Sequence, residues 1–323
     1  MTNPSRDFNV WAGEDGLWRY LHLADAPPTP LVELPRTANR LAGEGVRILL
    51  KLMCYLPFFN GKQIPVLFIL MAAKAAGRLT GVHTVVEATS GNTGFALLMY
   101  APFFGILNVV ILTPDDTPQT KIDMLEQFGA TVQKYRRGDV SGVTLARTMG
   151  EQEGWLNLGQ YERNENILGH ALITGAQLVE QMRAIQTEPS LLCAGLGTTG
   201  TLRGSHQVFE EAGLHIQTLG LICASGNIVS GVRSEKGLAE VPLAELPGVD
   251  HRTEVTAEET GAHQEILHQH RLLLGCPSGF LLAGMLKFLE GERDAGRLDA
   301  LRSPRTNEVV AVGVAMDTFF AYM

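Results

Sequence analysis

The sequence has few cysteines and no hydrophobic run long enough to cross a bilayer. Its four cysteines are widely spaced and form no CxxC pair, which argues against a zinc site or a disulfide framework. The most apolar stretch, residues 64–73, is shorter than the roughly 20 residues that a membrane helix needs, so no membrane association is expected. We expect no metal site, and reduced, mostly buried thiols at Cys54, Cys193, Cys223 and Cys276.

Basic residues are also scarce. The chain has 26 Lys and Arg against 34 Asp and Glu, a formal net charge of −8, which argues against a nucleic-acid partner. An anionic small substrate stays compatible with this charge, because a site needs only one or two local donors. Residues 1–16 are polar and lack the apolar centre of a secretory signal, so the cytoplasm is the expected location.

Short apolar strands alternate with helix-like segments along the chain of 323 residues. Such alternation is typical of an α/β fold, in which helices cover a parallel sheet. The expected strands are residues 47–52, 84–88, 107–112, 131–135, 190–193, 219–224 and 309–314. The expected helices include residues 64–78, 120–128 and 256–272, with others after glycine-rich turns.

The economical arrangement is two α/β domains with parallel-type twisted sheets, residues 1–155 and 156–323. We expect the ligand between them, where strands end in glycine-rich turns. Residues 1–26 carry no strong pattern and are expected to lie over the surface.

Two glycine-rich turns each follow a strand and open a helix. In residues 197–201 (GTTGT), backbone N–H groups can approach a ligand, hydroxyls add donors and the helix N-terminus adds positive potential. Together these features suit a phosphate. Residues 89–93 (TSGNT) have the same geometry with a side-chain amide, which suits a carboxylate and a phenolic or hydroxyl oxygen. Either turn alone could be a tight connection that binds nothing.

A lysine, Lys62, lies at a predicted helix start, where the field of the helix N-terminus disfavours the charged amine. A neutral amine is the form that makes a Schiff base with an aldehyde cofactor. A solvated surface lysine is the alternative. A third turn, residues 274–279, places Ser278 near the next helix start, where its hydroxyl could cap the helix or bond a ring nitrogen.

These segments, in this order, resemble a known family. The series TPLVEL (29–34), Lys62, ATSGNTG (88–94), AGLGTTGTLRG (194–204), GCPSG (275–279) and VAMDT (314–318) is similar to the fold-type-II, tryptophan-synthase-β-like enzymes that use pyridoxal 5′-phosphate. The similarity is greatest to the cysteine synthases, and especially to those that use O-phosphoserine. It spans residues 29–318.

The resemblance implies a role for each matching residue. Lys62 would form the Schiff base, Asn92 would bond the phenolate oxygen of the cofactor, and Ser278 would face its pyridine nitrogen. The phosphate cup would comprise Gly197, Thr198, Thr199, Gly200 and Thr201. The substrate would be bound by Thr89, Ser90, Gly91, Thr93 and Gln160.

Arg233 follows the predicted strand at residues 219–224. In the O-phosphoserine-using relatives an arginine in this region holds the substrate phosphate. A guanidinium suits that role, because it is a permanently charged, planar fork of donors. A surface arginine is an equally good interpretation of the sequence alone.

The segment around Lys62 departs from the family pattern. Family members usually carry Ser-Val-Lys-Asp-Arg or similar after an Asn-Pro pair, whereas residues 56–64 here read LPFFNGKQI. Phe319 stands where a small residue is common. A cofactor-free scaffold or regulatory protein is therefore an alternative to an enzyme.

The implied activity is β-replacement on an activated serine, O-phosphoserine or O-acetylserine, through an enzyme-bound aminoacrylate, giving cysteine. An amine nucleophile or plain β-elimination stays open, because sulfide and small amines leave little trace in side chains. The implied partners are the amino-acid substrate, a small nucleophile and a second copy in a homodimer. Apolar stretches around Phe58, Phe68 and Phe103 could be ordinary core or a contact with an additional protein.

Overall fold

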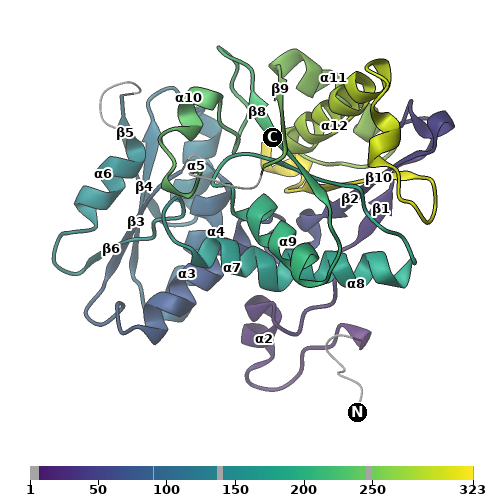
Figure 1. Ribbon diagram of the computed structural model, residues 1–323. Coiled ribbons are helices and arrows are strands. Elements are labelled where there is room, and N and C mark those ends of the chain that lie inside the picture. The colour runs from purple at the N-terminus through teal and green to yellow at the C-terminus, as the bar shows by residue number, and fades with distance from the viewer. Residues whose placement is uncertain (1–6, 90, 137–140, 245–248, 323) are drawn as a thin grey trace.

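The computed structural model describes residues 7–89, 91–136, 141–244 and 249–322, which form two sheets flanked by helices (Figure 1). The larger sheet has six strands in the order β1-β2-β10-β7-β8-β9. In it β1 runs antiparallel to β2, whereas the other neighbours are parallel. The strands are β1 (Leu31–Glu33), β2 (Val46–Leu52), β7 (Leu191–Gly195), β8 (Gln217–Cys223), β9 (His251–Val255) and β10 (Val309–Ala315).

The smaller sheet has four parallel strands in the order β5-β4-β3-β6. Figure 1 shows it on the left with its helices. The strands are β3 (Thr84–Ala88), β4 (Asn108–Pro114), β5 (Ala130–Tyr135) and β6 (Trp155–Asn157). The helices of this half are α3 (Gln63–Ala75), α4 (Asn92–Tyr100), α5 (Gln119–Gln127) and α6 (Gly142–Met149).

One helical stretch connects the two halves. Helix α7 (Glu165–His170), a π-helical turn (Ala171–Gly175) and α8 (Ala176–Ala184) follow one another without a break, and α7 packs against both α3 and α9 (Gly200–Glu211). On the larger sheet, α11 (Ala257–Gln269) packs against α12 (Cys276–Asp294), which lies on β7, β9 and β10. The short α10 (Glu235–Leu238) follows β8.

The strand pattern of the sequence reflects burial on both faces. Every residue of β3 and of β10 is buried. Parallel strands covered by helices on both sides read as continuous apolar runs, which is why the sequence identifies them well. All seven expected strands are present with small shifts at their ends, so the predicted α/β fold is confirmed.

The two sheets do not divide the chain at residue 155. The smaller sheet is built from residues 84–157, whereas the larger sheet takes strands from residues 31–52 and 191–315. The link is β10, which pairs with β2 on one side and β7 on the other. Hydrophobic runs identify strands but carry no information on which strands pair. A division of the chain by residue order therefore does not reveal that β10, late in the chain, pairs with β2, early in the chain.

The N-terminal segment contains a helix that was not expected. Helix α2 (Gly16–His22) has too few turns for a clear helical period, and its burial comes from tertiary contacts. The ring of Trp18 lies 5.5 Å from that of Phe103 and 5.8 Å from that of Phe104. The chain itself therefore covers part of the apolar surface around Phe103, and Phe58 and Phe68 likewise pack against the core.

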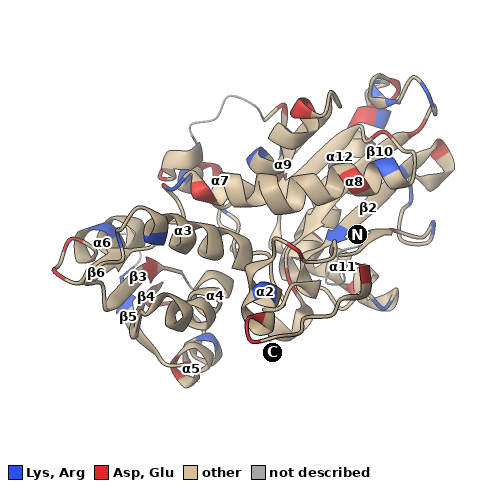
Figure 2. Ribbon diagram, turned by 90° about the horizontal axis from the view of Figure 1, so that it is seen from below, with Lys and Arg blue, Asp and Glu red and all other residues tan. Residues whose placement is uncertain are grey.

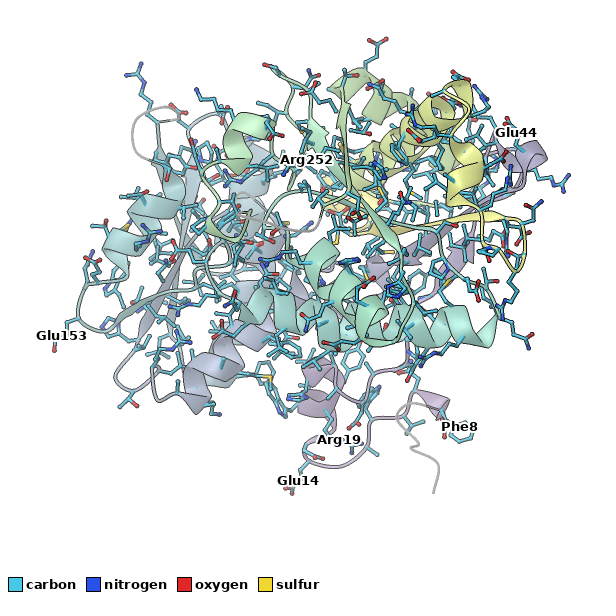
Figure 3. All side chains as sticks on the ribbon, in the orientation of Figure 1. Phe8, Glu14, Arg19, Glu44, Glu153 and Arg252 are labelled. Atoms are coloured by element: carbon cyan, nitrogen blue, oxygen red, sulfur yellow. The ribbon has the colours of Figure 1, made fainter. Side chains whose placement is uncertain are left out.

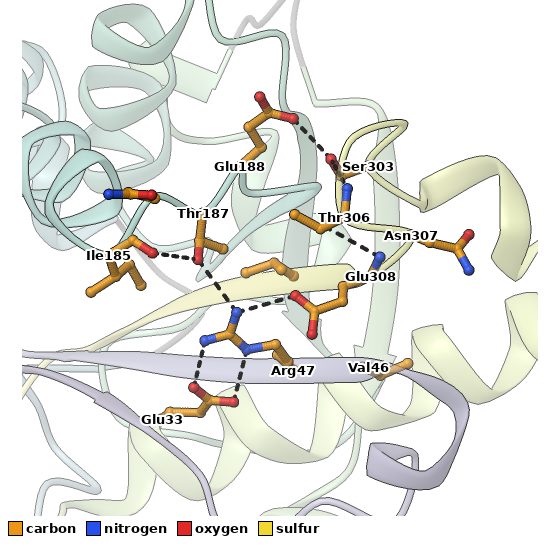
Figure 4. A network of polar contacts seen from close by, with 12 residues as sticks. Glu33, Val46, Arg47, Ile185, Thr187, Glu188, Ser303, Thr306, Asn307 and Glu308 are labelled. Atoms are coloured by element: carbon orange, nitrogen blue, oxygen red, sulfur yellow. Dashed lines mark hydrogen bonds and ion pairs between the residues drawn. The ribbon is translucent and has the colours of Figure 1, made fainter.

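An arginine on β2 ties together the edge of the larger sheet (Figure 4). The guanidinium of Arg47 donates to both carboxylate oxygens of Glu33, at 2.9 and 2.7 Å, and also to Glu308 and Thr187. The pairing with Arg47 lowers the pKa of Glu33. Because this network joins β1, β2 and the start of β10 away from the cavity described below, its role is to stabilise the fold.

Acidic and basic residues are dispersed over both halves of the molecule (Figure 2). Within the described ranges, no helix is both long and apolar enough to span a membrane. The four cysteines are unpaired, as expected; two of them, Cys193 and Cys223, are buried and the other two half-buried.

Candidate active site

A cavity of about 610 Å³ lies between the two halves, at the carboxyl ends of three strands. Its wall includes Ala88 at the end of β3, Gly195 at the end of β7 and Val314 near the end of β10. Parallel α/β sheets bind their ligands at such ends. The predicted site residues that the structure describes line this cavity, apart from Gly200 and Ser278, each of which is next in sequence to a lining residue. Ser90 falls outside the described residues.

Lys62 immediately precedes α3, and its side chain lines the cavity. Its backbone N–H donates to Oδ1 of Asn60 at 3.0 Å, which fixes the start of the helix. Burial is the main reason why the pKa of the Lys62 amine falls to about 8, with Glu87 and Asp317 opposing the shift and Arg233 assisting it. The lowered pKa of Lys62 was predicted from the field of the helix N-terminus, but its main cause in the structure is burial. An amine with this pKa is partly neutral near pH 7, as attack on an aldehyde requires.

The turn at residues 197–201 presents free backbone donors. Strand β7 ends at Gly195 and α9 begins at Gly200, and the amides of residues 197–201 donate no hydrogen bond to any described residue. Thr199 has a φ of 69°, a left-handed conformation that is uncommon for threonine and typical of functional turns. Free amides at a helix N-terminus are a suitable site for a phosphate.

Two glycines shape this turn because neither has room for a side chain. A Cβ on Gly197 would lie 2.2 Å from the backbone oxygen of Gly231. A Cβ on Gly200 would lie 2.1 Å from Oδ1 of Asn166. Each glycine therefore lets the turn pack tightly against a neighbouring segment, which holds the free amides in place.

The threonine hydroxyls of the turn are less available than the sequence suggested. Thr199 donates to the backbone oxygen of Leu243 at 3.1 Å, and Thr201 bonds Nε2 of His170 at 3.2 Å. Burial, with a smaller effect of Lys62, lowers the pKa of His170 to about 3, so this imidazole is neutral. The backbone amides, rather than these two hydroxyls, are the donors left for a ligand.

The turn after β3 places Asn92 at the first position of α4. Its Nδ2 donates to Oδ2 of Asp317 at 2.5 Å. Asp317 belongs to the segment that follows β10. Thr89 and Gly91 line the cavity beside Asn92, and nothing occupies the space that a Cβ on Gly91 would take. This loop is therefore open toward the cavity.

A buried glutamate, Glu87, supports that loop, and the sequence analysis did not predict this role. It accepts hydrogen bonds from the backbone N–H groups of Ala88 and Gly159 and from the backbone and side chain of Gln160. Burial raises the pKa of Glu87 to about 7 against the effect of these bonds. Gln160 also accepts from the hydroxyl of Thr93 at 2.9 Å. The feature of the sequence that could have identified Glu87 is a charged residue inside the otherwise apolar strand TVVEA.

Ser278 lies in the first turn of α12 and is fully buried. Its Oγ finds no hydrogen-bond partner within the described part of the chain. It does not cap the helix, so that alternative is not realised. A buried hydroxyl without a partner is costly, and it is the kind of group that a bound ligand satisfies.

Arg233 lies between β8 and α10 and lines the cavity. Its guanidinium lies 4.6 Å from the ring centroid of Tyr161, and Nη1 donates to the backbone oxygen of Gly237 at 3.3 Å. The interpretation of Arg233 as a surface arginine is therefore not supported, because the structure brings it into the same cavity as Lys62.

The donor set of this cavity is specific. It combines a lysine amine of lowered pKa, free amides at a helix start and an asparagine amide, with the unpartnered hydroxyl of Ser278 next to the lining residue Pro277. An aldehyde, a phosphate, a phenolate oxygen and a ring nitrogen are the groups that these donors suit. Fold and cavity together define a two-sheet α/β enzyme whose site fits pyridoxal phosphate.

Comparison with known proteins agrees with a site for pyridoxal phosphate. The family described as "Pyridoxal-phosphate dependent enzyme" matches residues 24–298, and the chain belongs to this family. It is 27% identical over 289 residues to cysteine synthase B of Pseudomonas aeruginosa, covering 88% of this chain and 94% of that protein. It is 25% identical over 274 residues to O-ureido-L-serine synthase of Streptomyces lavendulae, covering 81% and 82%.

Solved structures confirm the fold. A crystal structure of O-ureido-L-serine synthase matches with a TM-score of 0.76 and 21% identity, covering 94% of this chain and 92% of that one. A hydrogen sulfide-producing enzyme from Fusobacterium nucleatum also matches with a TM-score of 0.76, at 19% identity, covering 94% and 99%. The fold-type-II architecture expected from the sequence is the one observed.

Proposed function

We propose that this chain replaces the leaving group on the β-carbon of an activated serine, and that sulfide as the nucleophile gives cysteine. The observation that carries the proposal is the amine of Lys62, with its lowered pKa, in one cavity with the free amides of residues 197–201. Pyridoxal phosphate, when bound, supplies an electron sink for breaking the Cα–H bond. The relatives named cysteine synthase B and O-ureido-L-serine synthase support this class of reaction.

The residues of the cavity divide the work. Lys62 would hold the cofactor through its amine, and its Nζ would take the Cα proton of the substrate and later return it. The amides of residues 197–201 hold the phosphate. Asn92 would donate to the phenolate oxygen, and the hydroxyl of Ser278 would bond the ring nitrogen.

The loop after β3 binds the substrate carboxylate. Thr89, Ser90, Gly91 and Thr93 are the proposed contacts, with Thr89 and Gly91 lining the cavity. Gln160, proposed from the sequence as a substrate contact, has its amide engaged with Thr93 and Glu87. Its proposed role is therefore to hold the loop in position.

The proposed donor is O-phosphoserine, with Arg233 as the partner of its phosphate. A phosphate dianion in a partly closed cavity needs a fixed positive partner to offset its desolvation. We expect Arg233→Ala to lower kcat/KM for O-phosphoserine by about 30-fold or more, the effect of removing one partner of a buried charge pair. The same variant should leave kcat/KM for O-acetylserine, which carries no such charge, nearly unchanged. Steady-state kinetics with sulfide and both donors, with products identified by mass, measures this.

A matched control is Arg252→Ala, because Arg252 pairs with Glu235 outside the cavity. That variant should leave both donors unaffected. If Arg233→Ala lowers kcat/KM equally for both donors, Arg233 has a structural role and does not bind the phosphate of the donor. Formation of a keto acid, or of an amine adduct in preference to cysteine, would overturn the proposed nucleophile and leave the donor test standing.

We also propose that the chain works as a cytoplasmic homodimer. The four unpaired cysteines support a reducing compartment. Exposed apolar side chains support a second copy: Phe8 is 72% exposed and points away from the molecule (Figure 3), and Leu168 and Leu172 are 50% and 56% exposed. Sedimentation at micromolar concentration should give the mass of two chains, and a stable monomer would contradict the proposal.

A further inference from the structure

Asp317 did not stand out in the sequence, yet it and the residue before it contact three segments of the proposed cofactor site. It follows β10, is fully buried and lines the cavity. Its backbone oxygen accepts from the N–H of Gly275 at 3.1 Å, at the start of the helix that carries the buried serine. The preceding residue, Met316, accepts from the N–H of Gly61 at 2.8 Å, directly before the reactive lysine.

The carboxylate of Asp317 reaches the third segment. Its Oδ2 accepts from Nδ2 of Asn92 at 2.5 Å and from the hydroxyl of Tyr322 at 2.6 Å, whereas Oδ1 has no partner within the described ranges. A Cβ on Gly275 would lie 2.1 Å from Oδ1. The first glycine of the GCPSG motif is therefore required for the close approach of this carboxylate.

An ionised carboxylate only accepts hydrogen bonds, whereas an asparagine amide has a donor end and an acceptor end of nearly the same shape. Next to Oδ2, the donor end of Asn92 is attracted and the acceptor end repelled. Burial raises the pKa of Asp317 to about 6, with Tyr322, Asn92 and the lysines Lys121 and Lys62 opposing the rise, so the group is ionised at neutral pH.

We infer that Asp317 is a positioning residue, which holds the Asn92 amide so that one N–H bonds Oδ2 and the other is left for the phenolate oxygen of the cofactor. This inference rests on the proposed function, because it assumes that Asn92 meets that oxygen. Tyr322 supports the carboxylate from the other side, and its ring in turn lies 5.0 Å from the ammonium of Lys121. The segment after β10 thereby contributes to the proposed cofactor site through Asn92.

The test is a double-mutant cycle on cofactor affinity. Dissociation constants of pyridoxal phosphate are measured by titrating visible absorbance for wild type, Asp317→Asn, Asn92→Ala and the double variant. Asp317→Asn keeps the shape but removes the charge, so we expect about tenfold weaker binding, the difference between a charged and a neutral hydrogen bond. In the Asn92→Ala background the same change should cost less than about twofold. Thr318→Ala, whose hydroxyl bonds Leu273 outside the cavity, is the control and should bind like wild type.

Equal losses in both backgrounds would overturn the inference, since Asp317 would then act independently of Asn92. Wild-type affinity in Asp317→Asn would overturn it as well. If Asp317→Asn fails to fold by circular dichroism, Tyr322→Phe replaces it in the cycle, with a smaller loss that again disappears in the Asn92→Ala background. A wild type that binds no cofactor would overturn the proposed function together with this inference, whereas wild-type binding with additive losses overturns the inference alone.

Discussion

Replacing Lys62 with alanine is expected to lower kcat by about 10³-fold or more, because one side chain supplies both the covalent link to the cofactor and the proton transfer at Cα, and proton transfer alone contributes about 10²–10⁴-fold. Burial lowers the pKa of the Lys62 amine to about 8, so part of it is in the neutral form that this chemistry needs near pH 7. The measurement is kcat with the preferred donor and sulfide, on protein saturated with pyridoxal phosphate. Saturation separates loss of chemistry from loss of cofactor.

Lys74→Ala is the matched control for that experiment. Lys74 lies in the last turn of the same helix, is exposed and does not line the cavity. Its replacement should leave kcat within about twofold of wild type, as is usual for exposed positions away from a site. Full activity in Lys62→Ala would remove Lys62 from the mechanism altogether.

Replacing Gly200 with leucine is expected to weaken cofactor binding by about 100-fold or more, because moving the turn disrupts several hydrogen bonds to a charged phosphate at once. The first atom of the new side chain would already lie 2.1 Å from Oδ1 of Asn166, so the turn or the asparagine has to move. The measurement is the ratio of pyridoxal phosphate to chain in purified protein, followed by the dissociation constant on reconstitution.

Gly261→Leu introduces the same residue where it should do no harm. Gly261 lies on α11 and is exposed, and apart from the backbone of its own helix no atom lies within 4 Å of the position of a new Cβ. This variant should retain cofactor like wild type. Retention of full cofactor by Gly200→Leu would show that the phosphate is bound elsewhere.

The sequence predicted most of the fold because the buried parallel strands of both sheets are continuous apolar runs. It did not predict that β2 would pair with β10 across most of the chain, since strand pairing depends on which surfaces meet in three dimensions. Helix α2 was not predicted for a related reason. Its burial depends on the contact of Trp18 with Phe103 and Phe104, which a local sequence pattern does not indicate.

The candidate site divides in a similar way. Glycine-rich turns after strands have a local cause, so Asn92 and residues 197–201 could be identified from spacing, and the structure brings them into one cavity with Lys62. Glu87 and Asp317 act through partners far away in the chain: Glu87 bonds Gly159, and Asp317 bonds Asn92. A buried acid in an apolar run is visible in the sequence, but its partner is not.

A competing lysine makes the central claim easy to test. Lys51 is also buried, and burial lowers the pKa of its amine to about 7. Its Nζ, however, donates to the backbone oxygen of Thr29 at 2.7 Å and to the side chains of Gln177 and Gln181 at 2.8 and 2.9 Å. Lys51 also lies outside the cavity wall, so its amine is engaged in holding the fold.

The most direct measurement is borohydride reduction of the protein loaded with pyridoxal phosphate, followed by peptide mapping by mass. Reduction fixes the cofactor to whichever lysine carries it. The account predicts one pyridoxyl group per chain, on the peptide containing Lys62. A label on Lys51, Lys74 or Lys121, or no label on protein that has been saturated with the cofactor, would contradict it.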